Sequence, residues 1–350
     1  NTSFVMGRPV VKVGVNGYGV IGKRVAEAVE KQNDMKLIGV SDISADWRIK
    51  LALRKFPIFC SDKSAEKHMK SRGIDIAGYL EDLIKQVDVI VDCTPAGIGA
   101  KNKPIYEKLG VKAVFEGGEK HEIAGVSFVA TCNYDESLGK QFTRVVSCNT
   151  TALCRVLGAL HRQFGIEKAY AVIIRRACDV WESHKVGIIN TVVPELHVPS
   201  HHGPDVQKVI HDLNITTMAA KGSHNLYHIH FAVIQLKIKA SKEEVIRCLE
   251  KEPRVVLVSG EDGIVALNSI VELSRDLGRP RGDLYEIPVW EDSISVDNDG
   301  TVYMIWATPN ESNVIPDNVD AIRALTEVES DWRESVKKTD NSLGVLSKLY

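Results

Sequence analysis

Two segments of the 350-residue chain carry residue types whose spacing suits a chemical reaction. In one of them, residues 144–151, Cys148 stands where an apolar strand-like run gives way to a helix-like pattern. Ser147 or Asn149 can cap that helix. The positive end of a helix dipole lowers the pKa of a thiol and enriches the thiolate, which is the nucleophile that carbonyl chemistry needs. We therefore predict that Cys148 is a nucleophile, and the alternative is a buried structural cysteine.

A nucleophilic cysteine needs a nearby group that handles protons. Eight of the eleven histidines lie between residues 184 and 230, so this stretch is where we look for one. His228 and His230 alternate along a predicted strand and so share one of its faces. Either can reach into a cleft, and either can equally be a core histidine. A zinc site is a rival interpretation, but the cluster lacks paired thiolates and an H-E-x-x-H spacing, so no metal is expected.

The other segment, residues 17–22, is a G-x-G-x-x-G that follows a strand-like run and opens a helix-like one. Its first glycine permits a tight turn, its second lets the backbone approach a pyrophosphate, and its third lets helix and strand pack closely. Asp42 closes the next strand, where a carboxylate accepts hydrogen bonds from ribose hydroxyls and favours NAD over NADP. The alternative is a glycine-rich turn in an unrelated domain, with Asp42 as a helix cap. The predicted cofactor contacts here are Asn16, Gly17, Gly19, Val20, Ile21, Gly22 and Asp42.

Later loops fit the same cofactor site. Thr94 and Pro95 follow a buried strand at its carboxyl end, where open α/β sheets bind ligands, and Gly118 follows the next one. Each of these loops can also be a simple turn. Arg175 and Arg176 end a strand and can clamp a phosphate or carboxylate, or form a solvated basic corner.

These residues need a scaffold, and the hydrophobic periodicity predicts one. The first ~115 residues alternate short apolar strands with helices, which indicates a doubly wound parallel sheet, an α/β Rossmann domain. After about residue 145, long strands and helices form an α+β catalytic domain with a mixed or antiparallel sheet. An amphipathic helix at 316–336 is expected to return to the first domain. The predicted domains are residues 1–147 with 313–350, and residues 148–312.

Composition excludes several classes of protein. With 44 basic and 46 acidic residues the net charge is −2, which argues against a nucleic-acid partner. No apolar run approaches the ~18 residues of a membrane span, and residues 1–9 lack a signal-peptide pattern. Residues 1–3 match a glycosylation sequon, but the internal Met6 marks them as leader or tag residues. Seven irregularly spaced cysteines favour reduced thiols and a cytoplasmic location.

With these motifs in view, the chain resembles the archaeal-type (class II) glyceraldehyde-3-phosphate dehydrogenases over nearly its whole length. The two most specific blocks are residues 145–151 (VVSCNTT) and 199–205 (PSHHGPD). The others are VNGYG at 15–19, DCTP at 92–95, GIGA at 97–100, GGEK at 117–120, EIPVW at 286–290 and PDNVDA at 316–321.

The resemblance implies a reversible, NAD-dependent phosphorylating oxidation of glyceraldehyde 3-phosphate to 1,3-bisphosphoglycerate. Cys148 forms a thiohemiacetal and then a thioester, which inorganic phosphate cleaves. The base maps to His228, with His230 as the second choice. The family pattern assigns substrate contacts to Ser147, Asn149, His201 and His202, and cofactor contacts to Arg176 and Asn310. It also implies a homotetramer, a phosphorylated small-molecule aldehyde as partner, and a place in glycolysis or gluconeogenesis.

Three departures from the family pattern bear on specificity. Asp42-Ile43 replaces a Lys-Thr pair that many members with an NADP preference carry, which supports NAD while leaving NADP possible. Residues 222–225 (GSHN) replace a Pro-Thr-Thr that would contact substrate or phosphate, and Asn310 replaces a glutamine near the nicotinamide. The alternatives are therefore a divergent paralogue acting on a different aldehyde or acyl phosphate, or a non-catalytic protein that senses NAD or redox state.

Overall fold

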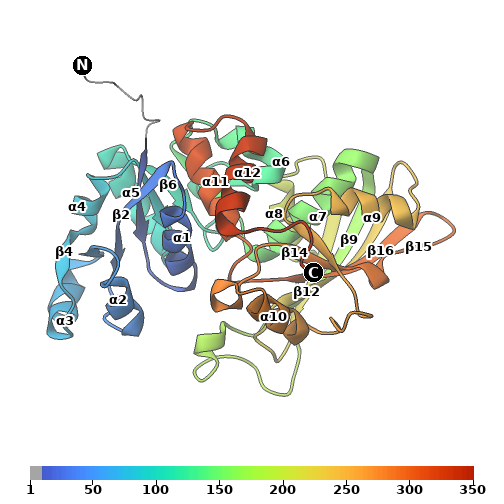
Figure 1. Cartoon of the computed structure of the whole chain (residues 1–350), viewed down its shortest axis with the longest axis horizontal. Coiled ribbons are helices and arrows are strands. Elements are labelled where there is room, and N and C mark those ends of the chain that lie inside the picture. The colour runs from blue at the N-terminus through green and yellow to red at the C-terminus, as the bar shows by residue number, and fades with distance from the viewer. Residues whose placement is uncertain (1–9) are drawn as a thin grey trace. The chain divides into compact units, whose positions relative to one another are not determined.

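The computed structural model describes residues 10–350, and the predicted leader with its sequon at Asn1 lies outside them. Within this range the chain forms two compact units, each built on an eight-stranded sheet (Figure 1). The first unit comprises the described residues up to Ala130, with Tyr134–Val145 and Ile315–Leu343. The second comprises Thr131–Asn133, Val146–Val314 and Gly344–Tyr350. Residues 344–350 thus lie in the second unit, whereas the sequence placed them with the first.

The first unit is a doubly wound α/β fold whose strands are all paired in parallel, in the order β4-β3-β2-β1-β5-β6-β8-β7. The strands are β1 (Val11–Asn16), β2 (Met35–Asp42), β3 (Ile58–Cys60), β4 (Ile76–Tyr79), β5 (Val89–Asp92), β6 (Lys112–Phe115), β7 (Ser127–Phe128) and β8 (Phe142–Val145). The helices are α1 (Val20–Glu30), α2 (Trp47–Ala52), α3 (Glu66–Ser71), α4 (Leu80–Ile84), α5 (Ile98–Leu109), α11 (Ile315–Thr326) and α12 (Trp332–Leu343), while α6 (Ala130–Asn133) crosses the boundary.

The strand order places a ligand crevice in this sheet. The chain runs outward from β1 through β2, β3 and β4, then returns to the other side of β1 with β5. The chain leaves β1 towards β2 and leaves β5 towards β6, on opposite sides of this pair of strands. The carboxyl ends of β1 and β5 therefore flank the point where open α/β sheets bind ligands. β5 (VIVD) is buried at every residue, and β1 (VKVGVN) is buried at every residue except Lys12, as a central parallel strand requires.

The C-terminal segment differs from its prediction. Instead of one amphipathic helix at 316–336, the chain forms α11 and α12, separated at residues 327–331. α11 is buried from Ile315 to Leu325, so it has no solvent face and an amphipathic interpretation was wrong. It packs on α1 and α12, and the buried Arg323 donates to Asp34 at 2.9 Å. Polar residues on a helix can be buried when such partners satisfy them.

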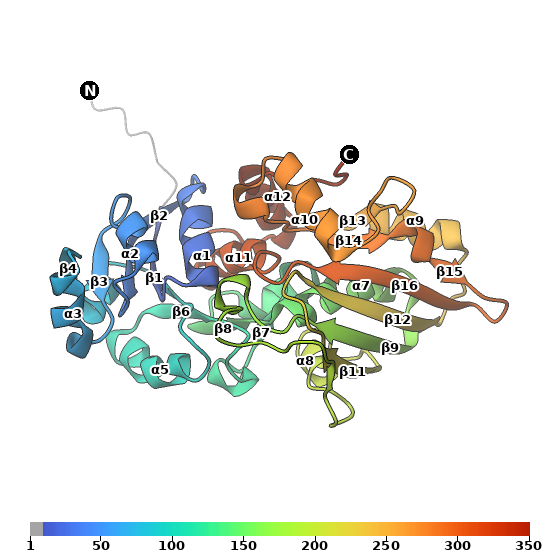
Figure 2. The same ribbon diagram turned by 90° about the horizontal axis from the view of Figure 1, so that it is seen from below.

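The second unit has a mixed sheet in the order β10-β11-β9-β12-β16-β14-β13, with β15 against β16. Its strands are β9 (Ile166–Arg175), β10 (Val193–Pro194), β11 (Ile215–Lys221), β12 (His228–Leu236), β13 (Val255–Val258), β14 (Ile287–Trp290), β15 (Ser295–Val296) and β16 (Thr301–Thr308). Its helices are α7 (Cys148–Phe164), α8 (His202–Gln207), α9 (Lys242–Glu250) and α10 (Leu267–Asp276). Figure 2 shows α7 running behind the long strands β9, β12 and β16.

A 3-10 turn at Glu291–Ser293 separates β14 from β15, and β11 lies between β10 and β9 in the sheet. His224 precedes β12, so it does not share the strand face of His228 and His230. Among residues 10–350, no helix combines the length and apolar character that a bilayer crossing requires.

Candidate active site

The predicted nucleophile and the predicted base are in contact. Cys148 begins α7, His228 begins β12, and the Cys148 Sγ lies 3.4 Å from the His228 Nε2. Ser147 is the N-cap of α7, and its Oγ accepts a hydrogen bond from the Thr150 N–H at 3.4 Å. A thiol and an imidazole at this distance form the pair that covalent catalysis on a carbonyl requires.

The expected depression of the Cys148 pKa was wrong. Desolvation raises the pKa of the Cys148 thiol above its usual value, and this outweighs three opposing contributions. These come from the guanidinium groups of Arg176 and Arg175 and from the backbone N–H of Asn149 at the helix start. The helix terminus acts in the predicted direction, but removing the thiolate from water costs more.

The hydrogen bonds of His228 determine where its ring proton lies. The backbone N–H of Arg176 donates to the Nδ1 of His228 at 2.8 Å. Nδ1 is therefore unprotonated, so the neutral ring carries its hydrogen on Nε2, facing the Cys148 sulfur. A flipped ring would place carbon atoms at both contacts, which supports this orientation. Burial and the nearby Arg176 hold the pKa of His228 well below its usual value, so the ring is neutral.

His230, the second choice for the base, is committed elsewhere. Its Nδ1 accepts from the indole N–H of Trp306 at 2.8 Å, and its Nε2 lies 2.8 Å from the Asn149 Oδ1. His230 is completely buried, and burial lowers its pKa to about 3. The ring therefore fixes the side chain of Asn149, which the sequence assigned to substrate contact.

His201 and His202, the predicted substrate contacts of the PSHHGPD block, lie at the start of α8 with their ring centroids 3.9 Å apart. His202 is buried with its Nδ1 3.0 Å from the Ser200 Oγ, whereas His201 is exposed and lies 3.4 Å from Glu195. Burial, His201 and Arg175 lower the pKa of His202 to about 2. The two imidazoles, together with the guanidinium of Arg175, can hydrogen-bond an anionic or hydroxylated substrate.

Arg176 and Asn310, two predicted cofactor contacts, lie in the second unit, whereas the glycine turn belongs to the first. Arg176 directly follows β9, and its guanidinium lies 3.0 Å from the Asp179 carboxylate. The buried Nε atoms of Arg175 and Arg176 have no hydrogen-bond partner among the described residues. Two unsatisfied donors of this kind suit an anionic ligand. Asn310 is buried just beyond the end of β16.

The glycine turn in the first unit has the shape that a pyrophosphate requires. Gly17 has φ +92°, and a Cβ there would lie 2.8 Å from the Cys93 carbonyl carbon. A Cβ on Gly22 would lie 1.7 Å from the Gly17 oxygen, so helix and turn can touch only through glycine. Above Gly19 there is open space, and no side chain caps α1. The helix start can therefore receive a phosphate, and these residues fit a dinucleotide.

The other predicted cofactor contacts surround this turn. Asp42 ends β2, and its carboxylate accepts from the Tyr18 N–H at 2.7 Å and from Ile43 and Ser44. Asp42 is thereby held beside the turn. Asn16, another predicted cofactor contact, is buried, and its side-chain N–H donates a hydrogen bond to the Tyr106 hydroxyl at 3.0 Å.

Thr94 and Pro95 lie in the loop after β5 and Gly118 in the loop after β6. These two loops touch, because a Cβ on Gly118 would lie 3.2 Å from the Ala96 Cβ. Val20 and Ile21 open α1 and are half-buried. The described residues thus bring the predicted contacts of the first unit to the carboxyl edge of its sheet.

Sequence reasoning missed two residues that hold the nucleophile. The Asn313 amide donates to the Cys148 carbonyl oxygen at 2.9 Å, and Thr150 donates to Asp205 at 3.0 Å, which ties α7 to α8. Asn313 stands in none of the specific sequence blocks, whereas Thr150 lies in VVSCNTT and Asp205 in PSHHGPD without a role assigned to either. The one sequence signal for Asn313 is that it lies three residues after Asn310, which replaces a glutamine of the family pattern.

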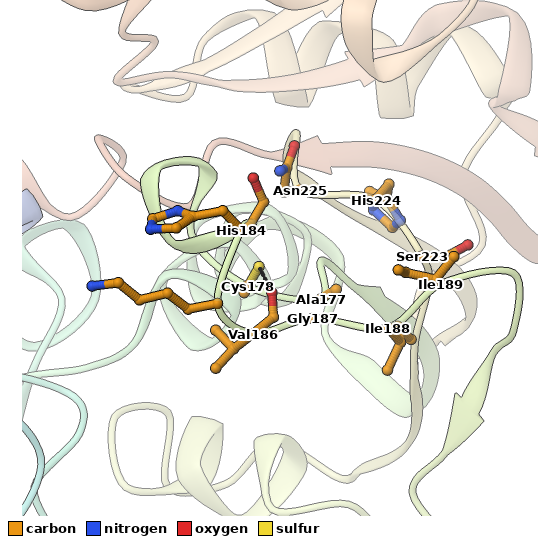
Figure 3. Close-up of a pocket in the computed structure, with 12 residues that line it drawn as sticks. Ala177, Cys178, His184, Val186, Gly187, Ile188, Ile189, Ser223, His224 and Asn225 are labelled. Atoms are coloured by element: carbon orange, nitrogen blue, oxygen red, sulfur yellow. Dashed lines mark hydrogen bonds between the residues drawn. The ribbon is translucent and has the colours of Figure 1, made fainter.

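A pocket of about 390 Å³ lies in the same unit, beginning one residue after Arg176 (Figure 3). It is lined by Ala177, Cys178, residues 183–189, and Ser223, His224 and Asn225. The last three belong to the segment that departs from the family pattern. A Cβ on Gly222 would lie 2.7 Å from the His224 Nδ1, so this glycine makes room for the histidine ring. Residues 223–225 therefore form a polar part of the pocket wall.

Comparison with known proteins gives this geometry its context. A family model described as "Glyceraldehyde 3-phosphate dehydrogenase, C-terminal domain" matches residues 147–293, and one described as "Dihydrodipicolinate reductase, N-terminus" matches residues 11–124. A protein of Thermococcus kodakarensis named "Glyceraldehyde-3-phosphate dehydrogenase" is 51% identical over 96% of this chain and 99% of its own length. Proteins of that name from Methanopyrus kandleri and Methanothermus fervidus are 48% and 46% identical, over 96% and 95% of this chain and 98% and 99% of their own. The chain therefore belongs to the glyceraldehyde-3-phosphate dehydrogenase family.

Proposed function

We propose that the protein catalyses the reversible, NAD-dependent oxidation of glyceraldehyde 3-phosphate with inorganic phosphate to 1,3-bisphosphoglycerate. The observation that carries the proposal is the contact of 3.4 Å between the Cys148 Sγ and the His228 Nε2 at the start of α7. Family membership supplies the substrate, and the glycine turn with Asp42 supports NAD, with NADP as a weaker alternative. A bound nicotinamide supplies the acceptor for the hydride.

The chain's own part in the reaction starts at the thiolate. The Cys148 sulfur attacks the aldehyde carbon, and the carbonyl oxygen becomes an alkoxide of a thiohemiacetal. When the hydride has left that carbon, the alkoxide electrons re-form the C=O bond of a thioester. A phosphate oxygen then attacks the thioester, the thiolate of Cys148 leaves, and the proton of the phosphate passes to solvent. The Cys148 thiol releases its proton to solvent before the first attack, so each later turnover releases one proton, that of the phosphate.

His228 has a different part from the one that the resemblance implies. With its hydrogen on Nε2, the neutral ring cannot accept a further proton at that atom. We therefore assign His228 the role of hydrogen-bond donor, first to the Cys148 thiolate and then to the alkoxide. An alkoxide formed directly by thiolate attack has no proton to remove, and a hydrogen-bond donor of this kind stabilises its negative charge.

Substrate recognition is proposed for the polar groups around the pair. Ser147, Asn149, His201 and His202 are the proposed substrate contacts, and all lie in the same unit as Cys148. The pocket of Figure 3, with His184, Lys185 and His224 in its wall, is the candidate site for the phosphate of the aldehyde. Its side chains can donate hydrogen bonds to an anion in place of the threonines that the family pattern has there.

A homotetramer is proposed from the open face of the second sheet. The strands β9, β11, β12 and β16 carry exposed apolar side chains, namely Tyr170, Val172, Met218, Phe231 and Tyr303. The register puts Val172 beside both Met218 and Phe231, so these side chains form one continuous surface. A contiguous apolar patch of this kind marks an interface, and we assign it to a second copy of the chain.

A cytoplasmic location is proposed as well. All seven cysteines are reduced in the structure, which suits a reducing compartment.

The function is tested by following NAD reduction with glyceraldehyde 3-phosphate, with and without phosphate or arsenate. We expect reduction that depends on the acceptor. Absence of reduction with this aldehyde would leave a paralogue for another aldehyde or a sensor protein. Reduction that ignores phosphate and arsenate would indicate a non-phosphorylating dehydrogenase. The Cys148→Ser variant is the negative control.

A further inference from the structure

A group of metal-binding side chains lies beside the proposed substrate contacts. One ligand atom each of Glu195, His201 and His202 lies within 4.8 Å of the others. The Glu195 Oε1 and the His201 Nδ1 are 3.4 Å apart. Zinc bonds of ~2.0–2.2 Å in tetrahedral geometry separate neighbouring ligand atoms by about 3.4 Å. Two of the three groups therefore already have the spacing of a zinc site.

Hydrogen bonds fix His202 in the form that binds a metal. The Thr217 hydroxyl donates to the Ser200 carbonyl oxygen at 3.1 Å, so the Ser200 hydroxyl is the donor in its 2.7 Å contact with the Thr217 Oγ1. The Ser200 oxygen must then accept from the Nδ1 of His202 at 3.0 Å. The ring therefore has its lone pair on Nε2. Ser200 and Thr217 are fully buried, which makes this relay rigid.

We propose that Glu195, His201 and His202 bind one Zn²⁺ ion, with water completing a tetrahedral site. Two imidazoles and one carboxylate are an established ligand set for zinc with an open fourth position. The Ser200 hydroxyl orients His202 in the way that metal-bound histidines are oriented by a partner on the other ring nitrogen. The Arg175 guanidinium, 4.0 Å from the second oxygen of Glu195, weakens the site without blocking it.

Zinc in this position occupies His201 and His202, so it excludes an aldehyde that needs them. We expect zinc to inhibit in competition with the aldehyde. This consequence rests on the proposed function, whereas the binding itself does not.

The test measures metal binding directly on the full-length, chelator-treated protein. Zn²⁺ affinity is determined by competition with a chromophoric chelator for the wild type, Glu195→Gln and Ser200→Ala. Glu167→Gln, a glutamate on β9 outside the cluster, is the matched control. Circular dichroism checks that each variant is folded. Co²⁺ absorption spectra distinguish nitrogen and oxygen ligands from thiolates, because only thiolates give intense charge-transfer bands.

We expect Glu195→Gln to weaken binding at least tenfold, Ser200→Ala to weaken it about 10–100-fold as loss of an orienting partner does, and Glu167→Gln to leave it unchanged. The Co²⁺ spectrum should lack thiolate bands. Wild-type affinity in Glu195→Gln would overturn the proposal. A thiolate band that Cys148→Ser abolishes would do the same, because the metal would then be on the nucleophile. If Zn²⁺ binds the wild-type protein but does not compete with the aldehyde, the proposed substrate contacts of His201 and His202 are refuted, whereas the metal site is not.

Discussion

His228 provides the sharpest test of the chemistry, because a donor and a base respond differently to replacement. The Arg176 N–H donates to the His228 Nδ1, so the ring hydrogen is on Nε2, which lies 3.4 Å from the Cys148 Sγ. The His228 side chain is almost completely buried from water. Removing one preorganised donor from an oxyanion lowers kcat by about 10²–10³. We expect His228→Ala to show a loss of this size.

The His228→Gln variant separates the two roles. A glutamine amide can accept from the Arg176 N–H and donate towards the sulfur, but it cannot take up a proton. If His228 is a donor, Gln restores a large part of the activity that Ala loses. If His228 is a base, the two variants are equally impaired. Stopped-flow measurement of NADH formation under single-turnover conditions reports the oxidation step without product release.

The pH dependence supplies the matching control. Desolvation raises the pKa of Cys148 and lowers that of His228, so only the thiol titrates towards alkaline pH. The kcat/KM for the aldehyde should rise with pH through the Cys148 pKa, which the pH dependence of alkylation by iodoacetamide measures independently. His228→Gln should retain this rise. The reasoning is refuted if the rise follows a group other than Cys148 and disappears in both His228 variants.

Four further results are expected. Asp42→Asn should reduce the preference for NAD over NADP about tenfold, or ~1.4 kcal/mol, because one charged acceptor is lost; an unchanged ratio of kcat/KM values would contradict this. Cys148→Ser should abolish turnover and retain NAD binding in a fluorescence titration, and residual turnover would exclude the nucleophile. Phe231→Glu should reduce the assembly to a smaller species by sedimentation, and an unchanged assembly would remove the proposed interface. Desolvation raises the pKa of Glu116 to about 8, so between about pH 5 and 8 the folded state holds a proton that the unfolded state has released, and the free energy of unfolding should fall as pH rises through this range. In urea unfolding, Glu116→Gln should reduce this fall, by a few kcal/mol at most. An unaltered pH dependence in Glu116→Gln would contradict the raised pKa.

The parallel domain was predictable because its signal is local. β1, β5 and β6 are short apolar runs between helices, and the glycine spacing at 17–22 has few other physical uses. The pairing of Cys148 with a histidine was also predictable in kind. What the pattern left open was which histidine, because β12 carries His228 and His230 on one face and a strand period cannot choose between them.

The errors arose where non-local contacts decide. α11 looked amphipathic from the spacing of apolar residues such as Val319, Ile322 and Leu325. Its charged residues Asp317, Asp320 and Arg323 are nevertheless buried too, because polar partners on other segments bond them. The Cys148 pKa was misjudged because a helix terminus is visible in a sequence and desolvation is not. Asn313, 165 residues from Cys148, bonds its carbonyl oxygen, a contact that no local spacing encodes.

The three buried histidines differ in which ring nitrogen carries the hydrogen, although they are the same residue type. His228 and His230 each accept an N–H at Nδ1, from Arg176 and from Trp306, so both carry their hydrogen on Nε2. His202 donates from Nδ1 into the Ser200 relay, so its Nε2 has a lone pair. Since lowered pKa values keep all three neutral, these backbone and side-chain partners alone decide which ring can donate and which can accept. A donor at the sulfur and an acceptor at the start of α8 follow from that difference, and so do both the proposed chemistry and the proposed metal site.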